Sequence, residues 1–463
     1  MVRLTGVLCA LLGVYISGNL AQQCFDENSA YRYYSSLSLY PQQPAVSARD
    51  NAPAGCRASL LFMLVRNGRR TPTNEEFNNF QARLPTLRQR ILQSQSSQLC
   101  EIDRINLQNW NMVFNASTTD LLTLRGEDEV KALAQRMQDK YPDLMRRGYN
   151  DQDFLIRHAY RTDRANTATG FAQGLGFNAS VARGPTRVER DLLLQFSALC
   201  EADDNDDDND EILEDFLEAP EVQKMMQDLT ARLGLAPNSL TLDDVDAMYK
   251  MCAYDYAMAV PSPWCAVFTN SDLQLLELKE DVISAEMYGY EDEINKKETC
   301  VLMKDFVDRM NDRQRQANLM PAVVAYFAKS ETILPFFTSL GLFEDEEDIE
   351  IDDDNLASLA NRKWRTSLIN PFMSNIAVTM YTCQVAGGAP TYSVKVAVNE
   401  VPVTLPKCDA TFCSMDNLME MIEDFAEECS FEEICDGVSA TSASVSFLAL
   451  MALISTLYAC LFS

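Results

Sequence analysis

Apolar runs and amphipathic helical stretches alternate along most of this chain. The run LLFMLV at 60–65 and the run VVAYFA at 323–328 are uninterrupted, which is typical of strands buried on both faces of a sheet. Between them, the stretch 119–145 spaces apolar pairs among charges and predicts a helix that ends near Pro142. A short extended run at 153–160 then precedes a helix that ends near Gly174 to Gly176.

The later parts of the chain complete this pattern. The segment from Val188 to about Asn295 is mostly helical in pattern, the run at 323–328 leads through a turn into a helix, and 375–384 and 392–405 alternate like antiparallel strands. We therefore expect an α/β fold with a central sheet flanked by helices, formed by 22–187 and 300–436. A mainly helical cap at 188–299 is expected as an insertion.

Composition and charge narrow the classes of partner. The 463 residues carry a formal net charge of −29, which disfavours nucleic acid and anionic lipid surfaces. Two acidic runs, at 201–215 and 343–355, are interpreted as solvated loops or cap surface, because they lack the ligand spacing of a calcium loop. With a single histidine in the chain, we expect no metal site, and no organic cofactor is implied.

Both ends of the chain predict processing in the secretory pathway. One arginine, an apolar run and small residues make 1–21 a predicted signal peptide. At the other end, small residues, a short spacer and an apolar tail at 437–463 predict a glycosylphosphatidylinositol (GPI) attachment signal, and hence a protein on the outer face of the plasma membrane. A terminal transmembrane helix and plain secretion are the alternatives.

Cysteines and sequons agree with that compartment. Of 14 cysteines, Cys9 and Cys460 lie in the two end segments, and the remaining 12 are expected to form disulfides. Asn115 and Asn178 each begin an Asn-Ala-Ser sequon and are predicted glycosylation sites. The disulfide pairing and the GPI attachment residue stay open.

The stretch RNGRRTP at 66–72 contains the main candidate functional residues. It resembles the Arg-His-Gly-x-Arg-x-Pro motif of the histidine phosphatase superfamily, and the chain as a whole is similar to the multiple inositol polyphosphate phosphatases within it. That wider resemblance rests on several further stretches: Leu122–Thr123 with Gly126, Gln173–Leu175, Ser262–Cys265, Tyr288–Tyr290, SETILPFFTSLG from Ser330, and Val398–Glu400.

The resemblance implies a role for each matched residue. Arg66, Arg70 and a third arginine would hold phosphate oxygens; Arg164 is the best match for the third, with Arg161 as the alternative. Asn67 stands where the family has its nucleophilic histidine. The family's His-Ala-Glu reads Lys329-Ser330-Glu331 here, so that Lys329 replaces the second histidine and Glu331 keeps the proton-donor position.

The two replacements change chemistry more than charge. The lone pair of an amide nitrogen is delocalised, so Asn67 cannot be phosphorylated as an imidazole is, although it can donate a hydrogen bond. Lys329 keeps a donor and adds a permanent positive charge. With three arginines and Lys329 opposed by Glu331, we expect an anion-binding pocket that has lost its nucleophile.

Three functions remain to be compared. The favoured one is a cell-surface or secreted protein that binds phosphate esters such as inositol polyphosphates, with catalysis impaired or absent. The second is an active acid or inositol polyphosphate phosphatase, which would use water or recruit the only histidine, His158, as nucleophile. The third is an extracellular structural or adhesion protein on this scaffold. The retained arginines disfavour the third function, and the missing histidines disfavour the second.

Overall fold

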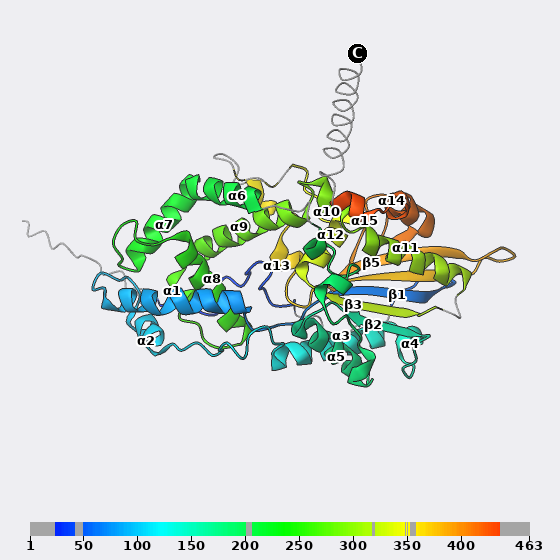
Figure 1. The fold of residues 1–463 in the computed structure, drawn as a ribbon, viewed down its shortest axis with the longest axis horizontal. Coiled ribbons are helices and arrows are strands. Elements are labelled where there is room, and N and C mark those ends of the chain that lie inside the picture. Colours follow the sequence, from blue (N-terminus) through cyan, green and yellow to red (C-terminus); the bar gives the residue numbers. More distant parts are fainter. Residues whose placement is uncertain are drawn as a thin grey trace, which may run out of the picture.

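A seven-stranded mixed sheet forms the centre of the fold (Figure 1). The structure is a computed structural model that describes residues 24–41, 50–200, 206–316, 320–347, 349, 351 and 358–435. The strands follow the order β2-β3-β1-β4-β5-β6, with β7 paired to β5. They are β1 (Cys56–Arg66), β2 (Phe154–His158), β3 (Val323–Ala328), β4 (Asn375–Cys383), β5 (Thr391–Val398), β6 (Val401–Val403) and β7 (Phe412–Ser414).

Strand direction separates the sheet into two halves. β2, β3 and β1 run parallel to one another, whereas β4 pairs with β1, and β5 with β4, in antiparallel fashion. Side chains of β1 alternate between the two faces of the sheet. One core contains Leu60, Phe62 and Leu64. The other contains Leu61, Met63 and Val65. The uninterrupted apolar run of β1 thus reflects burial on both faces.

Helices cover both faces of the sheet, which confirms the expected α/β architecture (Figure 1). One face carries α3 (Leu124–Lys140), α4 (Pro142–Met145) and α5 (Thr162–Gly174). The other carries α11 (Cys300–Arg315), α12 (Ser330–Ser339) and α14 (Met415–Glu427). The helix predicted to end near Pro142 is α3, which ends at Lys140; after Tyr141 the proline of α4 begins a new turn.

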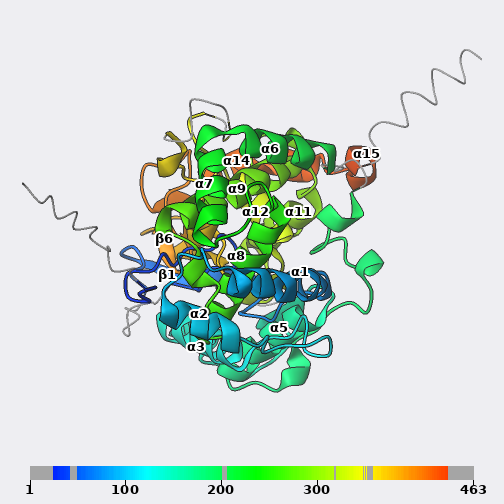
Figure 2. The same ribbon diagram turned by 90° about the vertical axis from the view of Figure 1, so that its left-hand side faces the viewer.

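The helical part of the fold lies at one end of the molecule (Figures 1 and 2). It contains α6 (Asp206–Glu218), α7 (Pro220–Arg232), α8 (Leu242–Ala257) and α9 (Asn270–Tyr288). The short helix α10 (Glu293–Lys297) lies beside α12 instead, and the described residues of 188–299 contain no strand. Two helices from before that segment, α1 (Asn74–Gln93) and α2 (Glu101–Asn109), join it, because α1 packs against α8. The domain boundaries at 187/188 and 299/300 stay a prediction.

One acidic run, expected to be a solvated loop or cap surface, is helical in its described part. From Asp206 onwards the run at 201–215 is helical and forms most of α6. Phe216 is buried and Ile212 is half-buried on a helix that contacts α9, whereas Asp210, Glu211, Glu214 and Asp215 are exposed. The apolar positions at helical spacing therefore account for the helix. The other run, at 343–355, lies partly outside the described residues.

The remaining elements are short. They are the helices α13 (Thr366–Ile369) and α15 (Phe431–Cys435), together with the 3₁₀ turns η1 (Ala179–Val181), η2 (Val188–Arg190), η3 (Ser197–Leu199), η4 (Cys265–Val267) and η5 (Ser358–Asn361).

Six disulfides join the cysteines outside the end segments, as the sequence predicts. The pairs are Cys24–Cys100, Cys56–Cys383, Cys200–Cys435, Cys252–Cys265, Cys300–Cys429 and Cys408–Cys413. A group of potential metal ligands, Cys24, Cys100 and Asp103, includes one of these pairs, and disulfide sulfur atoms are not thiolate ligands.

The two end segments are not part of this description. The predicted signal peptide at 1–21 and the predicted GPI signal at 437–463 lie outside the described residues. Among the helices that the structure does describe, none combines the length and the apolar character needed to cross a bilayer.

Candidate functional site

Three parallel strands deliver the candidate site residues to one edge of the sheet. β1 ends at Arg66, β3 ends just before Lys329, and β2 leads through three residues into α5. Carboxyl ends of parallel strands are the usual place for ligand sites in α/β folds. The loop after β1 is fixed by backbone hydrogen bonds from Arg66 N to Ser374 O (2.7 Å) and from Asn67 N to Ala328 O (3.1 Å).

A cavity of about 320 Å³ lies at this edge, and we call it the phosphate cavity after the role that the sequence predicts. All six residues assigned to the site from the sequence line it: Arg66, Asn67, Arg70, Arg164, Lys329 and Glu331. Residues separated by more than 260 positions in the chain are therefore brought together as expected. Phosphate binding by these residues depends on the orientation and charge of each side chain.

The Arg66 side chain is positioned by two backbone carbonyl groups and an aromatic ring. It is 4% exposed, and its Nη1 donates to the carbonyl oxygens of Ser36 and Asn370. Its guanidinium lies 5.3 Å from the ring centre of Phe372. Burial, followed by the positive charge of Arg70, lowers the pKa of Arg66 to about 10. Arg66 therefore stays cationic at neutral pH. The two carbonyl oxygens and the Phe372 ring hold its side chain in one orientation, and its Nη2 forms no hydrogen bond with the described residues.

Arg70 is held by oxygen atoms on one side. Its Nη1 donates to Thr71 O (2.9 Å), to the Tyr254 hydroxyl (3.1 Å) and to Glu76 Oε2 (3.4 Å). Burial acts against the charged form, yet the nearby Tyr254 and Glu76 raise the pKa of Arg70 above its ordinary value. These contacts fix the side chain with its charge intact.

Arg164 and Arg161, the two candidates for the third arginine, differ in burial and in their partners. Arg164 lies in the first turn of α5, is 6% exposed, and has a buried Nε without a hydrogen-bond partner in the described structure. Burial lowers the pKa of Arg164, and Asp163 and Glu331 oppose that change. Arg161 also lines the cavity, but it is exposed and pairs with Asp120 at 2.5 Å.

Asn67 lies at the centre of this arrangement and is 3% exposed. Its side-chain nitrogen donates to Gly68 O at 3.2 Å, and its backbone carbonyl oxygen accepts from Met373 N at 2.9 Å. The next peptide is held by α5, because Gly68 N donates to the Thr167 hydroxyl at 3.1 Å. The loop is thus built as a rigid frame around an amide that offers hydrogen bonds and no nucleophilic lone pair.

Lys329 and Glu331 form an ion pair at the start of α12. Lys329 Nζ donates to Glu331 Oε1 at 2.8 Å. Burial of Glu331 favours its neutral form, but the charge and hydrogen bond of Lys329 lead the groups that lower its pKa to about 2. A carboxyl group with that pKa is ionised even in mildly acidic solution, and so holds no proton for a leaving group.

The charge balance of the cavity differs from the one that the sequence suggested. Besides Arg66, Arg70, Arg164 and Lys329, the lining includes a fifth cation, Arg161. It also includes four carboxylates: Asp120, Asp163, Glu280 and Glu331. The sequence had indicated only Glu331 as an opposing charge. Asp163 adjoins Arg164 and could have been noticed for that reason, whereas Glu280 comes from the middle of α9 and has no local signal.

His158 is not part of this cavity. It ends β2, its Nδ1 lies 2.9 Å from the carbonyl oxygen of Ala159, and it does not appear among the described residues that line the phosphate cavity. Its ring packs against Gly184 so closely that a Cβ there would lie 2.2 Å from His158 Cε1. This placement does not support His158 as a substitute nucleophile.

Comparison with known proteins identifies the family to which this chain belongs. Residues 60–399 match the histidine phosphatase superfamily (branch 2). The chain belongs to this family. The match includes the loop after β1, both later strands of the parallel half, and the antiparallel strands β4 and β5. The family assignment made from the sequence motifs is therefore confirmed.

Curated relatives cover nearly the whole chain. Multiple inositol polyphosphate phosphatase 1 of Gallus gallus is 26% identical over 444 residues, which is 94% of this chain and 95% of the relative. The protein of the same name from Drosophila melanogaster is 28% identical over 431 residues, with 89% and 90% covered.

Solved structures show the same fold. A phytase from D. castellii superposes with a TM-score of 0.69 at 16% identity, covering 93% of each chain. The multiple inositol polyphosphate phosphatase of Bifidobacterium longum, in complex with inositol hexasulfate, superposes with a TM-score of 0.67 at 14% identity, covering 85% of this chain and 98% of the other. This histidine phosphatase fold thus extends over the sheet and the helical part.

Proposed function

We propose that this protein binds phosphate esters such as inositol polyphosphates in the phosphate cavity and hydrolyses them very slowly or not at all. The observation that carries this proposal is Asn67, which occupies the nucleophile position inside an intact frame of arginines. Arg66, Arg70 and Arg164 are buried or nearly so, are cationic, and converge on one cavity with Asn67.

Binding is supported by the chemistry of the frame. Fixed guanidinium groups are suited to phosphate oxygens, because they offer paired donors in a planar arrangement. The relatives named multiple inositol polyphosphate phosphatase and the inositol hexasulfate complex of the B. longum protein point to the same class of ligand. The four carboxylates of the cavity argue for weaker binding than three arginines alone would give.

Loss of catalysis is supported at two positions. At the first, the amide of Asn67 cannot form a phosphorylated intermediate. At the second, the ion pair of Lys329 with Glu331 keeps the carboxyl group ionised, so the proton-donor position has no proton to give at neutral pH. Each change affects a different half of the reaction, and together they favour a phosphate-binding protein over a slow enzyme.

We further propose that the protein is processed at 1–21, carries a GPI anchor attached after cleavage of the 437–463 tail, and is glycosylated. The six disulfides indicate a protein of the secretory pathway or extracellular space. Asn115 and Asn178 are both exposed, which a sequon must be in order to accept a glycan. Treatment with a phosphatidylinositol-specific phospholipase should release the protein from cells; failure of release would contradict the anchor.

The main test combines turnover and binding. The full chain, produced in a eukaryotic secretory host, is incubated with inositol hexakisphosphate and with an aryl phosphate between acid and neutral pH. We expect no phosphate release above that of a variant with Arg66→Ala and Arg70→Ala. Calorimetry with inositol hexakisphosphate should show saturable binding that this double variant loses.

The outcomes separate the three functions. Sustained turnover above the double variant would overturn the proposal in favour of an active phosphatase. Absence of both turnover and binding would favour a structural or adhesion role for the scaffold. Circular dichroism of the double variant must match the parent chain, because only then does lost binding report on the two guanidinium groups.

A further inference from the structure

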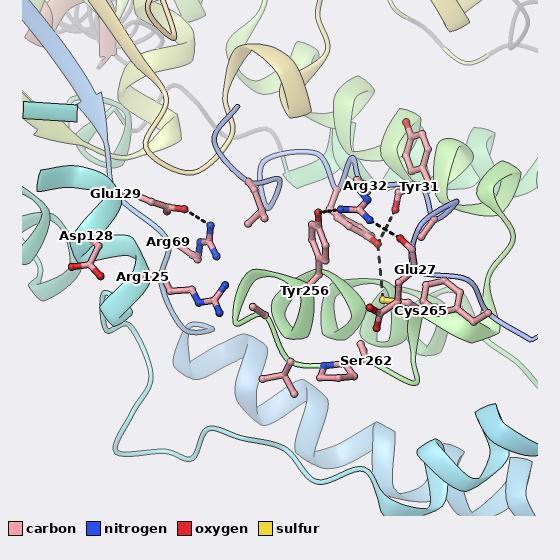
Figure 3. A pocket seen from close by; sticks show the side chains of 17 residues that line it. Glu27, Tyr31, Arg32, Arg69, Arg125, Asp128, Glu129, Tyr256, Ser262 and Cys265 are labelled. Atoms are coloured by element: carbon pink, nitrogen blue, oxygen red, sulfur yellow. Dashed lines mark hydrogen bonds and ion pairs between the residues drawn. The ribbon is translucent and has the colours of Figure 1, made fainter. Parts of the chain in front are cut away.

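A second cavity, of about 580 Å³, lies behind the active-site loop (Figure 3). Its walls come from the N-terminal segment 25–39, from the residues that follow α8, and from the first turns of α3. The loop itself contributes Arg69, whose neighbours Asn67 and Arg70 line the phosphate cavity instead. We call this second space the Arg69 cavity. Its size is within the range of cavities that hold small organic ligands.

One side of the Arg69 cavity is aromatic and apolar. Tyr34 and Tyr256 lie with ring centres 5.8 Å apart, and Phe25, Val260 and Pro261 line the same space. The Tyr256 ring is already covered by the guanidinium of Arg32 at 5.6 Å, and its hydroxyl accepts from Arg32 Nη1 at 3.1 Å. A ligand cation would therefore have to displace Arg32, whereas a flat neutral ring finds apolar contacts.

The other side is formed by two arginines. Arg69 is 5% exposed; its Nη1 donates to Ala257 O at 2.8 Å, and its Nη2 pairs with Glu129. Its Nε is buried and has no hydrogen-bond acceptor among the described residues. A buried N–H without an acceptor is costly and is the kind of group that a ligand oxygen satisfies.

Arg125 stands next to Arg69 on the first turn of α3 (Figure 3). It is exposed and forms no hydrogen bond within the described part of the chain. The carboxylate of Asp128 points away from it in Figure 3, and Glu129 is engaged by Arg69. This end of the cavity therefore offers donors from two guanidinium groups to one anionic group.

We propose that the Arg69 cavity binds a small aromatic carboxylate, with the ring beside Tyr34 and Tyr256 and the carboxylate on Arg69 Nε and Arg125. A polyphosphate does not fit this chemistry, because the lining has three arginines and three carboxylates and so no excess of positive charge. The proposal does not depend on phosphate binding, since the residues that carry it line a different cavity.

The test uses three probes matched to the two halves of the site. These are 3-phenylpropanoate, the neutral 3-phenylpropanol, and butanoate, which lacks the ring. Binding to the full chain is followed by ligand-observed nuclear magnetic resonance and calorimetry. We expect saturable binding of 3-phenylpropanoate and at least about tenfold weaker binding of the other two, because each lacks one half of the recognised chemistry.

Two variants locate the probe. Arg125→Ala should weaken binding of 3-phenylpropanoate about tenfold. Because Arg125 is exposed, the substitution should leave the folded structure intact. Arg146→Ala, at an exposed arginine paired with Asp139 elsewhere, should leave binding unchanged. The inference is overturned by equal affinity for the acid and the alcohol, by unchanged binding in Arg125→Ala, by displacement with inositol hexakisphosphate, or by absence of saturable binding.

Discussion

Lys329 Nζ lies 2.8 Å from Glu331 Oε1, and this ion pair forms where the family's second histidine and proton donor are expected. The pair links the two positions electrostatically. A histidine at 329 would be charged only in acid, whereas lysine is charged throughout the physiological range. The replacement therefore changes the protonation of a residue that is itself retained.

The ion pair predicts a pH-dependent contribution to stability. The pKa of Glu331 falls from 4.5 to about 2 on folding, so its stabilising effect is complete above about pH 5 and is lost as the pH falls towards 2. Because the Glu331 side chain is 31% exposed, we expect only about 1–2 kcal/mol. In urea unfolding, the stability difference between the parent chain and Glu331→Gln should shrink by that amount between pH 6 and pH 2.5. Asp409→Asn, at an exposed position, should show no comparable change.

Substituting histidine at both altered positions should restore phosphatase activity. In Asn67→His with Lys329→His, an imidazole gains the nucleophile position and the permanent charge beside Glu331 is removed. We expect phosphate release from an aryl phosphate near pH 7, where a histidine at 329 is mostly uncharged, to rise at least about 100-fold above the parent chain. Asn67→His alone should recover less, because Lys329 still keeps Glu331 ionised. Equal activity of the single and double variants would contradict the role given to Lys329.

The two candidate third arginines can be separated by substitution. Arg164 is buried against the cavity, whereas Arg161 is exposed and paired with Asp120. Arg164→Gln should weaken inositol hexakisphosphate about tenfold or more, and Arg161→Gln by less than about threefold. Calorimetry compares the two, with thermal unfolding as the check on structure. A larger loss in Arg161→Gln would reverse the assignment.

Close packing of α3 on the loop after β1 predicts an effect of Gly126→Ala. A Cβ at Gly126 would lie 2.4 Å from Arg69 O, so either α3 or the loop must move. Alanine improves helix propensity by about 1 kcal/mol, but we expect the clash to dominate and to lower the free energy of unfolding by about 1–3 kcal/mol. Gly148→Ala is the matched control, since no atom lies within 4 Å of its Cβ. A more stable Gly126→Ala would show that the contact is not tight.

Some features of the fold were readable because they are local. The apolar runs of β1 and β3 are long enough to require burial on both faces, and the amphipathic spacing of α3 fixes its buried side. The acidic stretch in α6 was expected to be a solvated loop or cap surface, and its described part is a helix whose two apolar positions, Ile212 and Phe216, are covered through packing on α9. The packing of α6 on α9, which is distant in sequence, determined the structure of that segment.

The sequence by itself determined most of the chemical identity of the site: arginines at 66 and 70, a third arginine at 164 or 161, the amide at 67, and the lysine and glutamate at 329 and 331. It did so because the residue types in a short motif specify which functional groups are present at the site. Tertiary structure alone decided the protonation of Glu331, the carboxylates from α5 and α9 that oppose the arginines, and the separation of Arg69 from its neighbours into a second cavity. Those properties depend on distance and burial between segments far apart in the chain, and no local pattern encodes them.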